Sequence, residues 1–347
     1  RIPNGALRMI SRVMSIDGTR HNFKSPAAIV SEFDVPTDAW FLSDNSNPTM
    51  PSAVLMEIAL QPCGFLSAWM GSPLIFPDAD LYFRNLDGKA TLLREIDLRG
   101  RTIVNHGRML SSTSIRGIVL QHFSFALSCD GERFYEGEAS FGYFTPETFA
   151  TQTGLDSGQR LLRWIDEPGR PVATPVAVDS AAARAALARS GPYARLAGGR
   201  LALLDQVQIV AGGGRYGNGY VAAQRRINPH EWFFQNHFYQ DPVMPGSLGI
   251  EAIIEALQAY ALATDSGRIL AGAWRFAPGA GQATTWKYRG QIVPQSTEMT
   301  LEAHVRAIEP SAGRLTLIAD ANVWCDGLRI YTVEHIAVDL VPIDRTS

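Results

Sequence analysis

The stretch Pro242-Val-Met244-Pro245-Gly246-Ser-Leu-Gly-Ile-Glu251 decides the fold, because a related stretch occurs earlier in the chain. That earlier stretch, Pro48-Thr-Met50-Pro51-Ser52, lies 194 residues upstream, and in both cases a glutamate follows the methionine by seven residues (Glu57 and Glu251). Each stretch opens an apolar segment that is long enough for a helix with proline at its first position, over 51–70 and 245–263. The sequence therefore predicts the same helical unit twice.

Two further blocks support a duplication. Leu7–Val13 aligns with Leu201–Val207 at the same offset of 194 residues, and Cys129–Tyr135 aligns with Cys325–Tyr331 at an offset of 196. Three blocks in one order at nearly one spacing indicate a tandem repeat.

The repeat divides the chain into three parts. We expect an N-terminal unit over 1–148 and a C-terminal unit over 198–347, joined by a linker over 149–197. The linker has no repeat partner, contains several prolines, and includes a short Ala/Arg-rich helical run over 181–188.

Strand-like segments surround each predicted helix. They are rich in β-branched and aromatic residues, and Asp-Gly turns at 130–131 and 326–327 separate two of the pairs. The predicted strands are Leu7–Ile16, Ile118–Leu127 and Phe134–Phe144 in the first unit, and Leu201–Val210, Glu298–Ala307, Arg314–Val323 and Leu328–Leu340 in the second. One long helix with several antiparallel strands predicts an α+β fold in which a sheet wraps round the helix. Two such sheets could pair edge to edge.

Composition excludes several classes of protein. Hydrophobic residues make up 46% of the chain and charged residues 19%, which is typical of a globular protein with a large core. The formal net charge of −3 argues against nucleic acid or an anionic membrane as the main partner. No apolar stretch approaches the roughly 20 residues of a membrane helix, and no signal peptide is recognisable.

The cysteines and the first residue bear on where the chain belongs. Three widely spaced cysteines indicate neither a disulfide framework nor a metal site, so we expect a reducing, cytoplasmic compartment. The chain begins at Arg1 and runs straight into patterned sequence, which leads us to expect a piece of a longer, multidomain polypeptide.

The segment from Trp232 to Ala252 resembles the signature of the β-hydroxyacyl-acyl-carrier-protein dehydratases, especially the β-hydroxydecanoyl dehydratase/isomerase type. His237 precedes Asp-Pro-Val-Met-Pro-Gly, and Glu251 follows that histidine by 14 residues. The similarity continues through 288–294 and 328–331, so it covers most of 200–340. The first unit resembles the family more weakly, through the duplication.

The resemblance implies a double hot-dog fold, as in the dehydratase domains of polyunsaturated fatty acid and polyketide synthases. It implies dehydration of a β-hydroxyacyl chain carried on the phosphopantetheine of an acyl carrier protein, with no metal and no redox cofactor. The implied partners are that carrier and neighbouring domains of a synthase. The sequence leaves open the acyl chain length, double-bond isomerisation and association into a homodimer.

The residues fit this chemistry on physical grounds. Dehydration needs a base at Cα, an acid at the β-hydroxyl and stabilisation of an enolate-like oxygen. His237 suits the base, because the pKa of histidine lies near neutrality. The Gly246 amide at the start of a helix suits the thioester oxygen. Phe238, Tyr239 and Met244 are candidates for the substrate tunnel, although the two aromatic residues could equally belong to the core.

The acid is Glu57 or Glu251. Glu251 lies about six residues into its helix, roughly 9 Å from the helix start, which stretches a partnership with His237 in the same unit. The family pairs its histidine with a carboxyl group across two hot-dogs, which implies His237 with Glu57.

The first unit lacks a histidine in the corresponding position. Alternative alignments place Ser43, or Asp44 or Asn45, in that position, and Ser52 replaces the glycine. We therefore expect one active site and one inactive one.

The remaining histidines have no motif around them. We expect them to be surface residues or hydrogen-bonded strand residues: His21, His106, His122, His230, His304 and His335. Two other functions stay open, a hot-dog acyl thioesterase and an inactive scaffold that binds acyl chains. The motif around His237 counts against the first, and an intact His237–Glu57 pair would count against the second.

Overall fold

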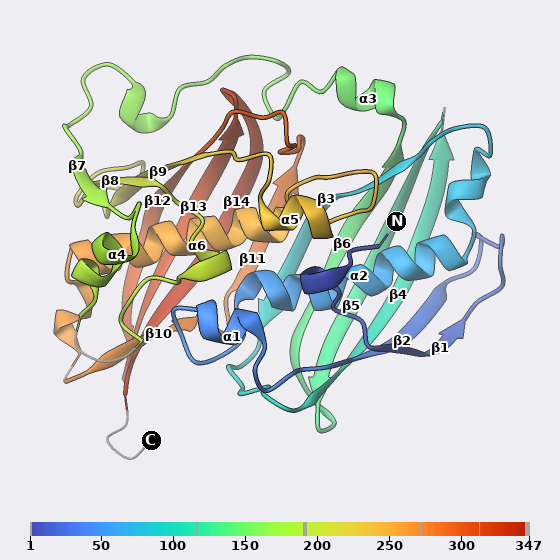
Figure 1. Cartoon of the computed structure of the whole chain (residues 1–347), viewed down its shortest axis with the longest axis horizontal. Coiled ribbons are helices and arrows are strands. Elements are labelled where there is room, and N and C mark those ends of the chain that lie inside the picture. Colours follow the sequence, from blue (N-terminus) through green and yellow to red (C-terminus); the bar gives the residue numbers. More distant parts are fainter. Residues whose placement is uncertain (1, 116, 190–192, 271, 312, 344–347) are drawn as a thin grey trace.

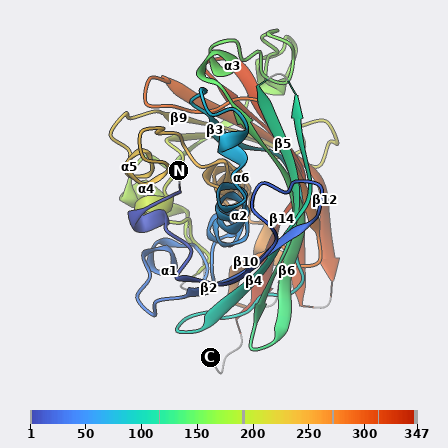
Figure 2. The ribbon, with the colours of Figure 1, turned by 90° about the vertical axis from the view of Figure 1, so that its right-hand side faces the viewer.

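Two long helices occupy the centre of the molecule, α2 (Ser52–Trp69) and α6 (Gly246–Ala263). The computed structural model describes residues 2–115, 117–189, 193–270, 272–311 and 313–343. In Figure 1 the two helices follow one another along the long axis, and Figure 2 shows both inside the curve of one sheet. Both helices are largely buried because they are apolar on nearly every face, as a helix enclosed by a sheet must be.

The sheet runs continuously through both units, and its paired strands are antiparallel. The first unit contributes, in spatial order, β1 (Arg12–Asp17), β2 (Ala27–Asp34), β4 (Thr102–Ile115), β5 (Ile118–Cys129), β6 (Glu132–Phe144) and β3 (Tyr82–Leu92). The second contributes β11 (Ala283–Tyr288), β14 (Leu328–Pro342), β13 (Arg314–Cys325), β12 (Glu298–Ser311), β9 (Tyr220–Arg226) and β8 (Gln206–Val210), while β10 (Trp274–Pro278) pairs with β14. The last strand of the order is β7 (Thr174–Ala177), from the connecting segment.

The two units join where β3 pairs with β11, with Thr91 opposite Ala283 and Asp87 opposite Lys287. This edge-to-edge junction turns two wrapped sheets into one, and the double hot-dog fold expected from the sequence is confirmed. The Asp-Gly pairs form tight turns as predicted, because Asp130 and Asp326 adopt φ values of 53° and 50°, which aspartate tolerates.

Short helices lie in the segments that connect the strands and the two long helices. They are α1 (Trp40–Asp44), α3 (Pro146–Ala150), α4 (Ala181–Leu187) and α5 (Trp232–Asn236), with the 3₁₀ turns Gly5–Leu7, Ser72–Ile75, Trp164–Asp166, Gly199–Leu201 and Ser266–Ile269. The first strand of each unit begins five residues later than predicted. Leu7 and Leu201 each lie in a 3₁₀ turn and are buried, so their apolar character reflects packing and not a strand.

The segment 149–197, expected as a linker, adds structure to the second unit. Its strand β7 pairs with β8, and its helix α4 carries Arg184, which forms a buried ion pair with Glu255 of α6. Arg184 also donates hydrogen bonds to the carbonyl oxygens of Ala197 and Leu204, at 3.0 and 2.9 Å. The segment is therefore anchored to the central helix.

The duplication is visible in matching hydrogen bonds. The Met9 amide donates to Gln61 Oε1 at 2.9 Å, and the Leu203 amide donates to Glu255 Oε2 at 2.8 Å. Met9 and Leu203 lie 194 positions apart, and so do Gln61 and Glu255.

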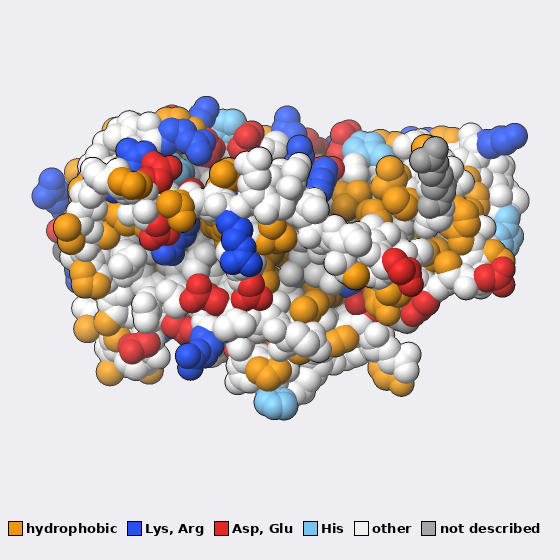
Figure 3. Space-filling view, turned by 90° about the horizontal axis from the view of Figure 1, so that it is seen from above, with side chains coloured by type: hydrophobic (Ala, Val, Ile, Leu, Met, Phe, Trp, Pro, Cys, Tyr) orange, Lys and Arg blue, Asp and Glu red, His pale blue; other side chains and the backbone are white. Residues whose placement is uncertain are grey.

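The surface shows charges of both signs close together. In the view from above, Lys and Arg side chains alternate with Asp and Glu, and hydrophobic side chains lie between them (Figure 3). No helix in the described ranges combines the length and hydropathy needed to cross a membrane.

Candidate active site

His237 ends helix α5 and begins the loop that leads to α6. Its Nδ1 lies 2.9 Å from the carbonyl oxygen of Val243. Because a carbonyl can only accept, Nδ1 carries the hydrogen and Nε2 is left with a free lone pair. Burial, against the opposing effect of the Val243 hydrogen bond and together with the positive charge of Arg84, lowers the pKa of His237 to about 3. The imidazole is thus neutral near pH 7 and can accept a proton.

Glu57 lies in the second turn of α2, on the other unit. Ser247 Oγ donates a hydrogen bond to Glu57 Oε1 at 2.6 Å, and Gln61 Nε2 donates to Oε2 at 2.8 Å. Burial raises the pKa of Glu57, and the two hydrogen bonds offset only part of this effect. A raised pKa suits a carboxyl group that has to donate a proton.

His237 and Glu57 line the same cavity, which has a volume of about 380 Å³. It runs between α2, strands β3 and β6, and the loop before α6. Aromatic side chains form much of its wall, including Phe83, Phe141 and Tyr288. The structure therefore brings together the two residues that the sequence nominated from different units.

Gly246 also lines the cavity, as the first residue of α6. Pro245 precedes α6 as its N-cap, as Pro51 precedes α2, so neither proline is the first helical residue and that detail of the prediction is wrong. The Gly246 amide is one of the orphan N–H groups that open a helix. A Cβ at this position would lie 2.6 Å from Tyr288 Cε2, while the Tyr288 hydroxyl donates to the Gly246 carbonyl at 3.2 Å. Only glycine fits here without displacing the tyrosine.

Two of the three candidate tunnel residues line the cavity, and the third does not. Phe238 and Met244 line the cavity. Tyr239 is 70% exposed and lies outside the lining, so its assignment to the tunnel is wrong. The reason is local backbone geometry: Phe238 and Gln240 adopt left-handed conformations, with φ values of 72° and 58°. The chain reverses between them and turns the intervening side chain outward.

Glu251 has a different role from Glu57. Its Oε2 accepts a hydrogen bond from the Ala53 amide at 2.9 Å, near the start of α2, and it does not belong to the cavity lining. Burial raises its pKa to about 7. The positions correspond across the repeat, since Ser247 and Ala53 lie 194 residues apart, as Glu251 and Glu57 do. In one unit the glutamate reaches the cavity, and in the other it satisfies the backbone of a helix end.

The first unit has no base at the corresponding place. Ser43 Oγ donates to the Trp40 carbonyl, Asp44 accepts from the Arg200 amide at 2.9 Å, and Asn45 Nδ2 donates to the Thr49 carbonyl. None of the three residues that the alternative alignments offer is a histidine. Beside the start of α2, a void of only about 50 Å³ lies between Ser52, Ile250 and Ile254.

Sequence reasoning missed the side chains of Ser247, Gln61 and Arg84, which line the cavity, and of Asp241, which contacts Arg84. Ser247 and Asp241 lie within the motif around His237, and Gln61 lies one helical turn after Glu57, so their spacing offered a signal. Arg84 on β3 forms an ion pair with Asp241, but no sequence pattern around Arg84 indicated this contact.

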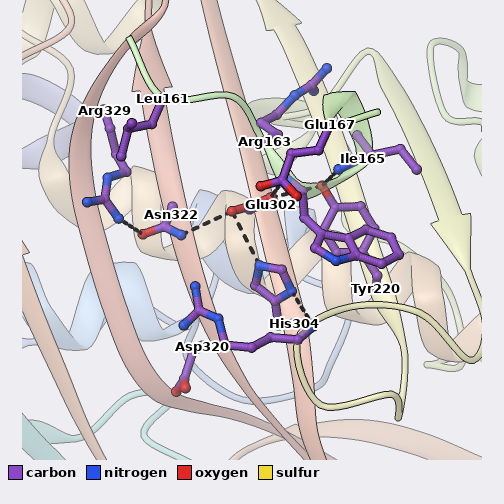
Figure 4. A network of polar contacts seen from close by, with 12 residues as sticks. Leu161, Arg163, Ile165, Glu167, Tyr220, Glu302, His304, Asp320, Asn322 and Arg329 are labelled. Atoms are coloured by element: carbon purple, nitrogen blue, oxygen red, sulfur yellow. Dashed lines mark hydrogen bonds and ion pairs between the residues drawn. The ribbon is translucent and has the colours of Figure 1, made fainter. Parts of the chain in front are cut away.

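A second polar network lies on strands β12 and β13 (Figure 4), and its residues do not line the cavity. Glu302 on β12 accepts hydrogen bonds from the Trp164 amide at 2.8 Å, the Tyr220 hydroxyl at 2.9 Å and Asn322 Nδ2 at 3.1 Å. His304 Nε2 lies 3.3 Å from the same carboxylate. Burial raises the pKa of Glu302, but its donors outweigh that effect and hold the pKa below its usual value. The network fastens the segment 149–197 to the sheet.

Replacing Glu302 with alanine should lower the free energy of unfolding by about 3 kcal/mol, because it leaves buried donors without an acceptor. Urea unfolding measures this loss. Glu309→Ala, at an exposed position of the same strand, is the matched control and should change stability little. Equal small losses in both variants would show that the network contributes nothing.

Metal binding finds no support in this geometry. Within the parts of the chain that the structure describes, no group of three or more His, Cys, Asp or Glu side chains could hold a metal ion. Cys63, Cys129 and Cys325 are buried and unpaired.

Comparisons with known proteins find both similar sequences and similar folds. A family model described as a FabA-like domain matches residues 196–334. The chain is 38% identical, over 356 aligned residues, to one of the subunits of the polyunsaturated fatty acid synthase of Thraustochytrium sp.; the alignment covers 97% of this chain and 24% of that protein. The chain thus spans about a quarter of the length of this relative.

Two solved dehydratase structures match nearly the whole chain. An isomerase-inactive variant of the first GphF dehydratase domain gives a TM-score of 0.51 at 12% identity, covering 97% of this chain and 98% of that one. An inactive mutant of the CurK dehydratase gives 0.50 at 10% identity, covering 96% and 99%. These likenesses support the double hot-dog fold. The sequence match to the FabA-like domain model includes His237 and Gly246, so residues 196–334 are similar to that family.

Proposed function

We propose that this chain dehydrates β-hydroxyacyl thioesters, carried on the phosphopantetheine of an acyl carrier protein, to α,β-unsaturated thioesters within a fatty acid, polyunsaturated fatty acid or polyketide synthase. The observation that carries the proposal is the shared cavity of His237 and Glu57, one a neutral imidazole and the other a carboxyl group with a raised pKa. The likeness to a component of a polyunsaturated fatty acid synthase supports the setting.

The base step falls to His237. Its Nε2 removes a proton from Cα of the substrate while Nδ1 stays bonded to the Val243 carbonyl, which fixes the ring. Negative charge then develops on the thioester oxygen. The Gly246 amide and the positive end of the α6 dipole stabilise that charge.

The acid step falls to Glu57. Its carboxyl group gives a proton to the β-hydroxyl, the Cβ–O bond breaks, and water leaves. The products are the unsaturated thioester and water, with protonated His237 and ionised Glu57 left behind. Proton exchange with solvent restores both groups. Ser247 and Gln61 hold the carboxyl group in place throughout.

The reaction involves no net oxidation, and these side chains supply both acid and base, so we propose no metal and no redox cofactor. The partners we propose are the acyl carrier protein and neighbouring synthase domains, since the relative is about four times as long as this chain.

The direct assay follows β-hydroxybutyryl and longer β-hydroxyacyl thioesters, free and bound to a carrier protein. We expect the α,β-unsaturated thioester and no free acid. A β,γ-unsaturated product would add isomerisation. Release of the free acid would favour a thioesterase, and no conversion of any carrier-bound substrate would favour an inactive scaffold.

Replacing Gly246 with alanine should lower kcat/KM on the order of 10-fold to 100-fold, because the added Cβ displaces Tyr288 and shifts the start of α6 against the thioester. Steady-state kinetics of crotonyl thioester hydration, the reverse reaction, measure the loss. Gly198→Ala is the control, since a Cβ there meets no atom within 4 Å. Full activity of Gly246→Ala would remove this glycine from the site.

A further inference from the structure

One ion pair links the first unit directly to the loop that carries His237. Arg84 on β3 donates to Asp241 through Nη1 at 2.7 Å and Nη2 at 2.6 Å, in a two-point geometry. The side chains of Arg84 and Asp241 are only 13% and 8% exposed. A buried two-point contact of this kind fixes orientation as well as distance.

Arg84 also contacts the other walls of the cavity. Its Nε donates to Gln291 Oε1 at 2.9 Å. The guanidinium lies 5.0 Å from the ring centre of Phe149 and 5.8 Å from that of Phe238. Phe238 in turn lies 4.0 Å from the His237 ring, centre to centre. One side chain of the first unit therefore reaches the immediate surroundings of the base.

The loop between His237 and α6 needs such a support. Two of its residues, Phe238 and Gln240, hold left-handed backbone conformations that cost energy in non-glycine residues. Its internal bonds are few: the Asp241 amide donates to the Phe238 carbonyl at a long 3.3 Å. Asp241 is the charged residue of this loop, and its partner lies on the other unit.

We propose that Arg84 is a positioning residue, which holds the loop through Asp241 so that the His237 ring faces the substrate and Glu57. This inference rests on the proposed function for its kinetic consequences. In this account the first unit, which lacks the catalytic histidine, makes a second contribution to the site besides the acid. The first unit thereby fixes the position of the base of the second.

The positive charge of Arg84 predicts a measurable effect on the pKa of His237, which a purely structural role of this side chain would not produce. The other titratable or charged side chains that line the cavity around His237 are Glu57, Tyr288, Arg289 and Tyr331. Arg84 is the charged residue that contributes to lowering the pKa of His237, after burial. Removing it leaves Asp241 unpaired nearby, so the pKa of His237 should rise.

The test compares Arg84→Met, Arg84→Lys, Asp241→Asn and the double variant Arg84→Met/Asp241→Asn. We expect Arg84→Met to lower kcat roughly 10-fold to 100-fold. Arg84→Lys keeps the charge but loses the two-point contact, so kcat should fall without a rise in the His237 pKa. The double variant should be no less active than Arg84→Met, because the two residues act as one unit.

Arg275→Met is the matched control. Arg275 forms a similar two-point ion pair between the units, with Glu95 at 2.7 and 2.8 Å, but neither residue lines the cavity. The Arg275→Met variant should lower the midpoint of thermal unfolding about as much as Arg84→Met does, while its kcat and the pKa of His237 stay unchanged. Equal kcat and equal His237 pKa in these two variants would overturn the proposal.

An NMR titration of the His237 ring, assigned by its absence in His237→Ala, gives a readout that needs no turnover. If wild type shows no dehydration, the proposed function fails, while a raised His237 pKa in Arg84→Met still supports the contact between Arg84 and the loop. If wild type is active and Arg84→Met neither slows it nor moves the titration, only this inference fails. Arg84→Lys and Asp241→Asn decide the matter if Arg84→Met does not fold.

Discussion

Replacing His237 with glutamine should lower kcat/KM for dehydration by roughly 10²-fold to 10⁴-fold, the range in which a positioned acid or base contributes to catalysis. Glutamine approximates the size of the ring and can still bond to the Val243 carbonyl, but it cannot take up a proton at neutral pH. Stability should change little, because the folded protein holds His237 as a neutral group. Kinetics with a β-hydroxyacyl thioester, beside urea unfolding, measure both quantities.

His230→Gln is the control, since His230 is an exposed histidine of the same region. It should leave kcat/KM unchanged. If His237→Gln keeps most of the wild-type activity while folding normally, another group removes the proton and the assignment of the base is wrong.

Glu57→Gln and Glu251→Gln should differ sharply, although the two glutamates occupy equivalent positions of the repeat. Glu57→Gln removes the proton donor from the cavity and should lower kcat by roughly 10²-fold to 10⁴-fold. Glu251→Gln keeps an acceptor for the Ala53 amide and should stay close to wild type. The same thioester kinetics compare them, and thermal unfolding confirms that both variants are folded.

The opposite result would relocate the site. If Glu251→Gln were inactive and Glu57→Gln active, the acid would come from the same unit as His237. Equal large losses in both variants would mean that the contacts between α2 and α6, and not one acid, limit the reaction.

The sequence predicted the fold well because the fold is repeated. Two apolar helical segments and the Asp-Gly turns recur at nearly constant offsets. An element predicted in one half is therefore supported by the matching pattern in the other half. The strand starts near Leu7 and Leu201 were misplaced for a shared reason. A buried apolar residue in a 3₁₀ turn has the same local pattern as the first residue of a strand.

The candidate site was predictable where one segment carries it. His237, Gly246 and Met244 lie within a single motif, and Glu57 follows from the repeat. Tyr239 could not be placed, because its direction depends on the left-handed backbone at Phe238 and Gln240, which no local pattern announced.

Arg84 could not be found at all from the sequence. It lies on a strand of the first unit, and its partner Asp241 lies 157 positions away. Only the packing of β3 beside the loop before α6 brings them together.

The two units have diverged into different roles. In the function proposed above, the helix start and the loop before it in the second unit supply the base and the oxyanion donor. The helix interior of the first unit supplies the proposed acid. In the second unit Glu255, which corresponds to Gln61 of the first, binds Arg184 of the connecting segment. The same position thus supports the acid in one unit and anchors the segment 149–197 in the other.

The most direct test of the single composite site is a crystal structure with a β-hydroxyacyl pantetheine amide, which cannot lose its acyl group by hydrolysis as readily as the thioester. We expect Cα beside His237 Nε2, the β-hydroxyl on the Glu57 carboxyl group and the carbonyl oxygen at the Gly246 amide. An acyl chain seated instead beside Glu251 and Ser52, in an opened form of the small void there, would contradict the account.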